Sequence, residues 1–413
     1  MFVVNAFRFG DLGRMMLPHV SRCMKEYDRI TQNGPPVTKA TKSHMAALLL
    51  ASSRFSDNSW KWKVVETTQQ ILSDDGDPYL YGWATQRKSS LLRMKGMMAE
   101  SSRTLEECIH STIFPSLDTP NIEKSRRWNA QRGELVVSFA DNLIMNGNTA
   151  LAEKELREWE PLSPDPISAM ELIVLRNRNT TLAKIFREER RFEESIVLFE
   201  KVLDESRDDK LYDHTGNRMI ILSNLADLYL ETGRADDAYK ILVPGIELMR
   251  SRGTLNISAG RRLNLALTEV YIRQGELDKA EKLLFELQAV IELDKDPDMI
   301  SKTAMFRVWS GLARISHTQG RWCDALSRWQ RALEAGEQCG WAEGKHPLNV
   351  VHYSLADVYD ELDRAEDAKK LIEQTEASLE EEGGKKFWMV GFATYWLEYV
   401  EERMKSKDEY VLV

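Results

Sequence analysis

The sequence predicts an all-α fold, a right-handed solenoid of about seven or eight stacked helical hairpins. The first observation is a fixed period, because turn residues recur at steps of 43, 42, 45 and 43 residues. The second is that apolar residues on both sides of each turn follow the three- and four-residue spacing of amphipathic helices. In a repeat array of this size each hairpin buries its faces only against its neighbours. The turn residues are Arg190, Gly233, Gly275, Gly320 and Asp363.

The segment around Gly233 shows how one repeat is built. Leu222, Leu225 and Tyr229 lie on one stripe of a first helix, and Gly233 supplies the left-handed backbone that ends it. Close helix crossings require a small side chain, and the predicted crossing residues are Ala226 and Ala238 in this repeat and Ala280 and Ala325 in later ones. The same small–aromatic–turn–small order, with Ser316 replacing one aromatic residue, recurs in Leu182–Ser195, Leu267–Ala280, Leu312–Ala325 and Leu355–Ala368.

This order of residues resembles the tetratricopeptide repeat (TPR) family, whose period is about 34 residues. The period here is longer by about one helical turn in each helix. Longer repeats of this kind are similar to those of kinesin light chains and of the C-terminal arrays of fungal NB-ARC signalling proteins. The stretch Gly344-Lys345-His346-Pro347 is similar to the join between their repeats. The resemblance implies a TPR superhelix whose first helices line a concave groove that holds a partner.

Stepping the period backwards from Arg190 predicts earlier, less regular repeats. Gly147 falls at the turn of a sixth repeat. A degenerate seventh would have Arg103 at its turn, Gly96 at the small position and Cys108 at the crossing point. A weaker one lies near residues 50–72.

The chain is therefore expected to have four regions. Residues 1–40 form an N-terminal helical lead-in, residues 41–160 carry degenerate TPR-like repeats, residues 166–378 form the regular TPR array, and residues 379–413 contain a C-terminal capping helix and tail. Trp388, Phe392, Tyr395, Trp396 and Tyr399 lie on one face of that last helix. A homodimer interface on this face is the alternative to capping.

Charge and composition limit the class of partner. Residues 1–150 carry 19 Lys and Arg against 15 Asp and Glu, and the remaining residues carry 37 against 50. A nucleic-acid-binding array would carry a basic stripe, so we expect neither a nucleic-acid nor a membrane partner. No signal peptide is visible and the four cysteines are scattered, which favours a cytoplasmic location, with the nucleus as an alternative.

The sequence carries none of the common catalytic or cofactor motifs, so we expect no enzyme activity, no cofactor and no metal. Cys108 and His110 have no second pair of ligands at zinc-like spacing. Asp294, Asp296 and Asp298 imitate a calcium loop, but Met299 stands where its glycine belongs.

The predicted groove lies on the side of each first helix opposite its apolar stripe. Glu269, His317 and Asp357 lie among the groove positions. The predicted partner-binding residues are Asn177, Lys184, Asn224, Asp227, Arg262, Arg307, Arg314 and Tyr353.

We expect Arg262, Arg307 and Arg314 to receive an acidic segment through charge-assisted hydrogen bonds, with Asn224 holding its backbone. Asn224 and Arg262 match two places of the family's carboxylate clamp for chaperone tails. Ala266 and Thr180 stand where that clamp has cations, so its specificity is not carried over.

The sequence thus predicts a non-catalytic scaffold or adaptor that binds another protein or an acidic peptide in a TPR groove. The alternative is a sensor arm detached from an NTPase-linked signalling protein of the NB-ARC type. An enzyme with unfamiliar helical chemistry is a third, less favoured interpretation.

Overall fold

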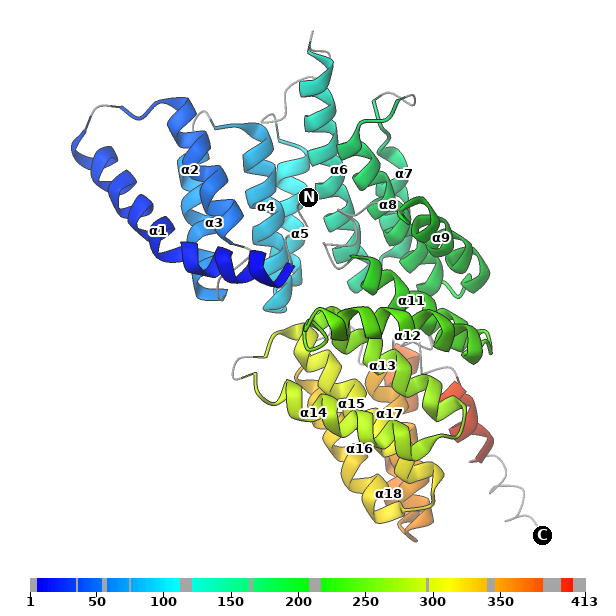
Figure 1. Ribbon diagram of the computed structural model, residues 1–413. Helices are drawn as coiled ribbons and strands as arrows, with labels where there is room; N and C mark the ends of the chain where they lie inside the picture. Colours follow the sequence, from blue (N-terminus) through cyan, green and yellow to red (C-terminus); the bar gives the residue numbers. More distant parts are fainter. Residues whose placement is uncertain are drawn as a thin grey trace. The chain divides into compact units, whose positions relative to one another are not determined.

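The computed structural model of the 413-residue chain is entirely helical in its described secondary structure, as the sequence predicts (Figure 1). The chain divides into two compact units, unit 1 (Met1–Ile185) and unit 2 (Phe186–Val413). The structure describes residues 6–34, 36–53, 58–73, 76–111, 121–162, 166–207, 217–294, 297–339, 346–381 and 395–403.

The helices follow one another as pairs joined by short turns. Before the unit boundary they are α1 (Ala6–Asn33), α2 (Lys39–Ser52), α3 (Asn58–Leu72), α4 (Pro78–Met94), α5 (Met98–Ile109), α6 (Ile122–Met145) and α7 (Thr149–Glu158). The boundary falls within α8 (Ala169–Glu188). Unit 2 continues with α9 (Phe192–Glu205), α11 (Asn217–Glu231), α12 (Ala235–Ser251), α13 (Ser258–Arg273), α14 (Leu277–Ile291), α15 (Met299–Thr318), α16 (Trp322–Glu337), α17 (His346–Glu361), α18 (Ala365–Glu381) and a terminal helix at residues 395–403.

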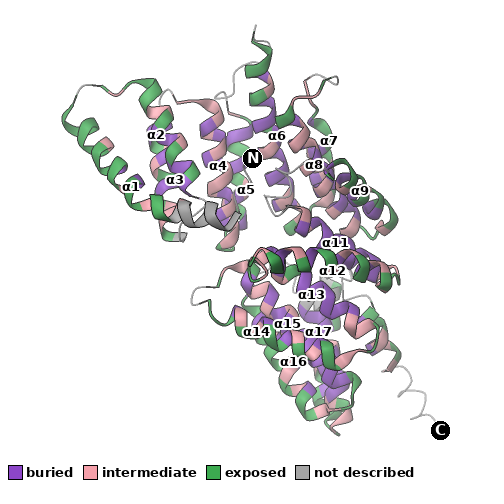
Figure 2. Ribbon diagram, in the orientation of Figure 1, coloured by how far each residue is buried: buried purple, intermediate pink, exposed green. Residues whose placement is uncertain are grey.

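We call α2, α4, α6, α8, α11, α13, α15 and α17 the first helices, and the helix that follows each of them the second helix. In unit 1, α2 contacts α4 and α4 contacts α6; in unit 2, α11 contacts α13 and α13 contacts α15. Second helices pack instead against their own first helix and the next one, as α12 and α14 do. The first helices therefore form a layer of their own in each unit. Figure 2 shows buried residues where neighbouring helices meet and exposed residues on their outer sides.

The turns between helices confirm the predicted period. Gly147, Gly233, Gly275 and Gly320 have φ between 67° and 75°, in the left-handed region. Arg190 and Asp363 adopt the same conformation with φ of 64° and 57°, although both carry a Cβ. Each turn is closed by a backbone hydrogen bond from the following residue to the carbonyl five positions earlier; in Tyr229–Arg234, for example, the N···O distance is 2.6 Å. This Schellman closure satisfies carbonyls that the helix end leaves open.

The degenerate repeat before Gly147 has a different register from the predicted one. Gly96, expected at the small position, is itself the turn residue, with φ of 78° and a closing bond from Met97 N to Leu92 O. Arg103 therefore lies inside α5 and not at the turn. Ser101 lies five residues after this turn, as Ala238 does after Gly233, and it is fully buried and hydrogen-bonded to Ser89. Stepping back from Gly147 by the regular period of about 43 residues missed this turn, because Gly96 and Gly147 are 51 residues apart.

The predicted crossing positions are closely packed. The side chains concerned expose none of their surface, as expected where two helices approach too closely for anything larger. They are Ala226, Ala238, Ala280 and Ala325.

The terminal helix packs on the end of unit 2. Trp396 and Val400 join a buried cluster that contains Trp329, Phe306 and Val351, and Trp396 is only 2% exposed. Its indole N–H donates to Ser354 Oγ at 2.9 Å. Trp396 and Tyr399 of the predicted aromatic face therefore pack against the chain's own core. Trp388 and Phe392, predicted on the same face, lie outside the described residues.

None of the described helices has both the length and the apolar composition needed to cross a membrane.

Candidate functional site

Two sets of polar side chains recur along the first helices. The first set, here called the anchor positions, follows directly after the small residue of each first helix from α6 to α17. It comprises Asp141, Lys184, Asp227, Glu269, Arg314 and Asp357. The second set, the upstream positions, lies seven residues earlier, on the same side of the helix two turns away. Its polar members are Glu134, Asn177, Arg262 and Arg307.

The anchor pair Glu269–Arg314 joins α13 to α15. The guanidinium of Arg314 donates two hydrogen bonds to the carboxylate of Glu269, at 2.7 and 2.9 Å. Arg273 Nε adds a third at 3.1 Å. The side chains of Arg314 and Glu269 are only 2% and 5% exposed. Burial would raise the pKa of Glu269, but the charges of Arg314 and Arg273 outweigh it, so the pKa lies below its usual value.

Asp227 is an anchor residue of a different kind. Its nearest cation is Arg307, two repeats later, whose Nη2 lies 3.4 Å from Asp227 Oδ1. Burial raises the pKa of Asp227, and the charges of Arg307 and Arg187 only partly offset that rise. Arg187 itself donates to Asn224 Oδ1 at 2.7 Å, and Asn224 Nδ2 donates to Ile220 O at 2.9 Å. The carboxylate is therefore held less firmly than that of Glu269.

The last anchor position is bound by the terminal helix. Asp357 Oδ2 lies 2.7 Å from His317 Nε2 and 2.9 Å from Arg403 Nε. Because the indole N–H of Trp329 can only donate, and it points at His317 Nδ1, the ring proton lies on Nε2 and is donated to Asp357. Trp396 packs edge-on against His317 with ring centroids 5.2 Å apart.

The terminal helix also reaches the neighbouring anchor residues. The guanidinium of Arg314 lies 5.2 Å from the Trp396 ring, and that of Arg273 lies 4.0 Å from the Tyr395 ring. We call Arg314, His317 and Asp357 the covered cluster. Their contacts are made by the chain itself, so they offer little to a partner.

The upstream arginines of unit 2 are more accessible. Arg262 on α13 is exposed, and 17% of the side-chain surface of Arg307 on α15 is exposed. The two residues are 45 positions apart, one repeat. We call them the accessible arginines.

Unit 1 repeats this arrangement with different chemistry. Asp141, an anchor residue, is held by Lys184 Nζ at 2.9 Å and by Arg93 Nη1 at 3.7 Å. Burial would raise its pKa, but these two cations lower it below the usual value. The upstream Glu134 accepts hydrogen bonds from two side-chain amides, Gln86 Nε2 at 3.1 Å and Asn177 Nδ2 at 2.8 Å.

The predicted binding residues therefore separate into groups. Arg262, Arg307 and Asn177 lie at upstream positions, whereas Lys184 and Asp227 are anchors bonded to other first helices.

Three of the predicted binding residues require correction. Arg314 is a buried partner of Glu269, because the close first helices leave it no path to solvent. Asn224 is 5% exposed and its amide is already bonded to Arg187 and Ile220. Tyr353 packs against the hydrophobic cluster around Trp329.

Sequence reasoning missed Asp141, Glu134, Arg187 and Arg403. Asp141 could have been predicted, because it directly follows Ala140, and the repeat period puts Ala140 at the small-residue position of its helix. Glu134 lies seven residues before it, as Arg262 lies before Glu269. Arg403 carried no such signal, because its contacts depend on how the terminal helix folds back.

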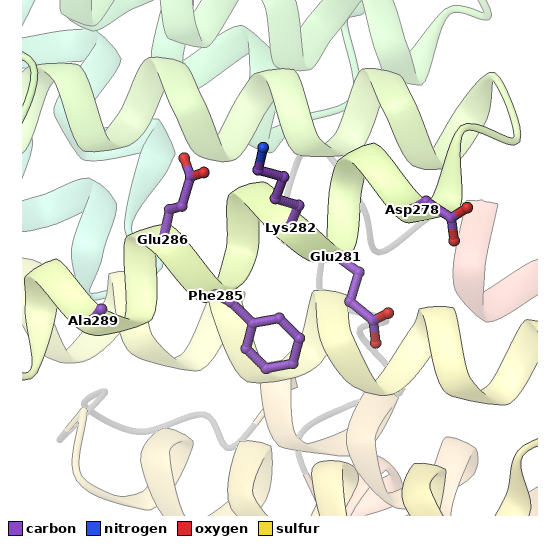
Figure 3. A pocket seen from close by; sticks show the side chains of 6 residues that line it. All are labelled: Asp278, Glu281, Lys282, Phe285, Glu286 and Ala289. Carbon is purple, nitrogen blue, oxygen red and sulfur yellow. The ribbon is translucent and has the colours of Figure 1, made fainter.

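A pocket in the described residues lies elsewhere, on the second helix α14 (Figure 3). It is a shallow hollow of about 580 Å³ lined by Glu281, Lys282 and Phe285, among others. Phe285 is 46% exposed, while Glu281 is bonded to Arg328 at 2.7 Å. The carboxylate of Glu281 and the ring of Phe285 both lie on the open surface of α14, so the hollow is not an enclosed site.

Metal-binding residues are not gathered in the described part of the chain, where no three His, Cys, Asp or Glu side chains lie close enough to share an ion. Asp298 of the apparent calcium loop instead accepts a hydrogen bond from Ser301 N and caps α15. Asp296 lies outside the described residues. Cys108 and Cys339 are buried, which raises the pKa of each thiol to about 11.

Comparison with known proteins places the fold. No family model and no curated protein matches the sequence. A Rap protein complexed with Competence and Sporulation Factor matches with a TM-score of 0.53 at 13% identity, over 90% of this chain and 98% of that one. The apo form of the quorum sensor NprR from B. thuringiensis matches with a TM-score of 0.53 at 13% identity, over 88% of this chain and 94% of that one. The human IFIT1 dimer with PPP-AAAA matches with a TM-score of 0.46 at 14% identity, over 90% of this chain and 81% of that one.

The fold is an all-α solenoid of TPR-like helical hairpins. At these identities the matches show the fold alone, and partner and function have to be argued from the chain's own side chains.

Proposed function

We propose that this protein is a non-catalytic interaction scaffold or adaptor, and that the accessible arginines of unit 2 bind an acidic segment of a partner protein. The observation that carries the proposal is the difference between Arg307 and Arg314. Both lie on α15, seven residues apart, yet Arg314 is buried in a bidentate pair while Arg307 makes one contact at 3.4 Å.

A partner carboxylate can therefore compete for Arg307 without breaking the fold. Hydrogen bonds between a guanidinium and a carboxylate are charge-assisted and contribute about 1.5–3 kcal/mol each. Arg262, one repeat earlier, provides a second cation at the matching position of the neighbouring first helix. Two cations at one-repeat spacing suit an extended acidic segment that crosses successive first helices.

The proposal excludes nucleic acid as the main partner. Unit 2 belongs to the acidic part of the chain, and the carboxylate of Asp227 lies 3.4 Å from Arg307. A phosphate backbone needs a continuous basic surface, whereas a short acidic segment needs only a few cations.

Affinity capture from the native cell tests the proposal. The protein would be used in its normal form and as the double variant Arg262→Glu/Arg307→Glu. The control is Arg250→Glu/Lys282→Glu, which makes the same charge change on the exposed surfaces of α12 and α14. We expect the variant to lose a partner that the normal and control proteins retain. Undiminished capture by the variant would move the binding surface elsewhere.

A second candidate is the sensor arm of an NTPase-linked signalling protein. The observation that favours it is the long repeat, because first helices such as α15, with 20 residues, match the longer hairpins to which the sequence is similar. An NTPase captured by the normal protein and encoded beside it would support this function. A captured partner with no NTPase domain and no such neighbour would leave the adaptor function.

A further inference from the structure

The carboxylate of Glu134 in unit 1 differs from the carboxylates at the anchor positions, because no cation lies beside it in the part of the chain that the structure describes. It accepts from Gln86 Nε2 on α4 and from Asn177 Nδ2 on α8, and both donors are neutral amides. Burial raises its pKa, those two hydrogen bonds lower it only in part, and the charge of Asp141 raises it further. The carboxylate is therefore held by two neutral donors, and none of the described residues supplies a cation beside it.

The same face shows how this fold neutralises a carboxylate when the charge is structural. Asp141 lies seven residues further along α6, and there Lys184 and Arg93 both approach it. At position 134, a neutral glutamine could link the same three helices without the cost of burying a charge. A glutamate at this position is thus a disadvantage to the isolated fold.

The site is also within reach of solvent. Glu134, Gln86 and Asn177 are all partly exposed. Each amide that donates to the carboxylate also carries a carbonyl oxygen, which is an acceptor. An ammonium group, with three N–H donors and no acceptor, is complementary to a carboxylate that is held only by neutral amides.

We propose that Glu134, Gln86 and Asn177 form a binding site for a positively charged side chain, of the lysine or arginine type, on a peptide or protein partner. This goes beyond the acidic-segment function of unit 2 and does not depend on it. Glu134 supplies the charge, while Gln86 and Asn177 position its carboxylate and complete the set of acceptors. Arg93 and Lys184 remain with Asp141, so they do not occupy the site.

The test uses two capped tripeptides on the full chain, one with a central lysine and the other with norleucine, which has a similar length and no charge. The side-chain amide NMR signals of Gln86 and Asn177, assigned from alanine variants, report directly on the site. We expect the lysine peptide at millimolar concentration to shift both signals, and the norleucine peptide to leave them unchanged.

Glu134→Gln should remove the response to the lysine peptide while keeping the helices linked, because the glutamine oxygen can accept from one amide and its NH2 group can donate to the carbonyl oxygen of the other once that amide has turned over. The matched control is Glu106→Gln on the exposed surface of α5, which makes the same charge change away from the site and should respond as the normal protein does. The proposal is overturned if the lysine peptide shifts neither signal, if norleucine shifts them equally, or if Glu134→Gln responds like the control. Binding of acidic segments by unit 2 would be unaffected by any of these results.

Discussion

The anchor and upstream positions lie on the same side of the same helices, two turns apart, and yet they have different environments. In unit 2 the anchor residues Glu269 and Arg314 are almost fully buried and bonded to each other. The upstream residues Arg262 and Arg307 reach solvent. The difference teaches that residue type and helical face do not determine whether an arginine is buried in an ion pair or reaches solvent. On α15 the determining factor is the carboxylate that the preceding repeat places beside Arg314.

The largest expected effect separates the two arginines of α15. Arg314→Met leaves the carboxylate of Glu269 buried with only Arg273 beside it, and removing one partner of a buried pair costs about 3–5 kcal/mol. Arg307→Met removes one contact of 3.4 Å from the buried Asp227 and should cost less, about 1–3 kcal/mol. Urea denaturation followed by far-ultraviolet circular dichroism measures both. Equal losses would mean that the anchor and upstream positions do not differ in the way described.

The next effect tests the repeat register on which both sets of positions depend. Ala238→Leu places a larger side chain at a crossing that exposes no surface, and overpacking of this kind costs about 1–3 kcal/mol. The damage should spread to adjacent repeats, because neighbours support one another. Ala289→Leu on the exposed surface of α14 is the matched control and should leave the unfolding curve unchanged. A normal curve for Ala238→Leu would show that the register is wrong.

A smaller effect concerns pH and distinguishes two anchor carboxylates. The pKa of folded Glu269 lies below its usual 4.5, so the stability it contributes is present above that pH and is lost as the pH falls through the folded value. The pKa of folded Asp227 lies above its usual 3.8, so its ionisation lowers stability as the pH rises through that interval.

Denaturation across this pH range therefore gives opposite trends. Glu269→Gln should lower the free energy of unfolding at neutral pH, and the loss should shrink below pH 4.5. Asp227→Asn should lower the free energy of unfolding less than Glu269→Gln does at neutral pH. As the pH falls, the normal protein gains stability by protonating Asp227, so the variant should become less stable relative to it. Parallel trends for the two variants would contradict the assignment of strong and weak pairing.

Much of this organisation could be predicted from the sequence. The period and the apolar spacing placed the helices, the turns and the crossing alanines, because these depend on local backbone and close packing. Arg190 and Asp363 were recognised as turns without glycine because the period required a turn there, and both have positive φ.

The candidate site was predicted only in part. The sequence placed Arg262, Arg307 and Arg314 on one face, but the burial of Arg314 depends on Glu269, 45 residues earlier. The cover over His317 and Asp357 depends on Arg403 and Trp396, which reach them only after the terminal helix folds back. Contacts of this range have no local signal. The repeat register around Gly96 was predicted wrongly for a different reason, because the repeat between Gly96 and Gly147 is longer than the others.

The central claim is that Arg307 recognises a carboxylate of a partner while Arg314 serves the fold. A charge exchange tests it most directly. Once the captured segment is known, its acidic residues would be replaced one at a time by lysine and the affinity measured against the normal protein and against Arg307→Glu, with Arg250→Glu as the control. The account predicts that one lysine-substituted segment binds Arg307→Glu at least about tenfold more tightly than the unsubstituted segment does, which corresponds to about 1.4 kcal/mol. If no substituted segment regains affinity for Arg307→Glu, the accessible arginines are not the binding surface and the claim is contradicted.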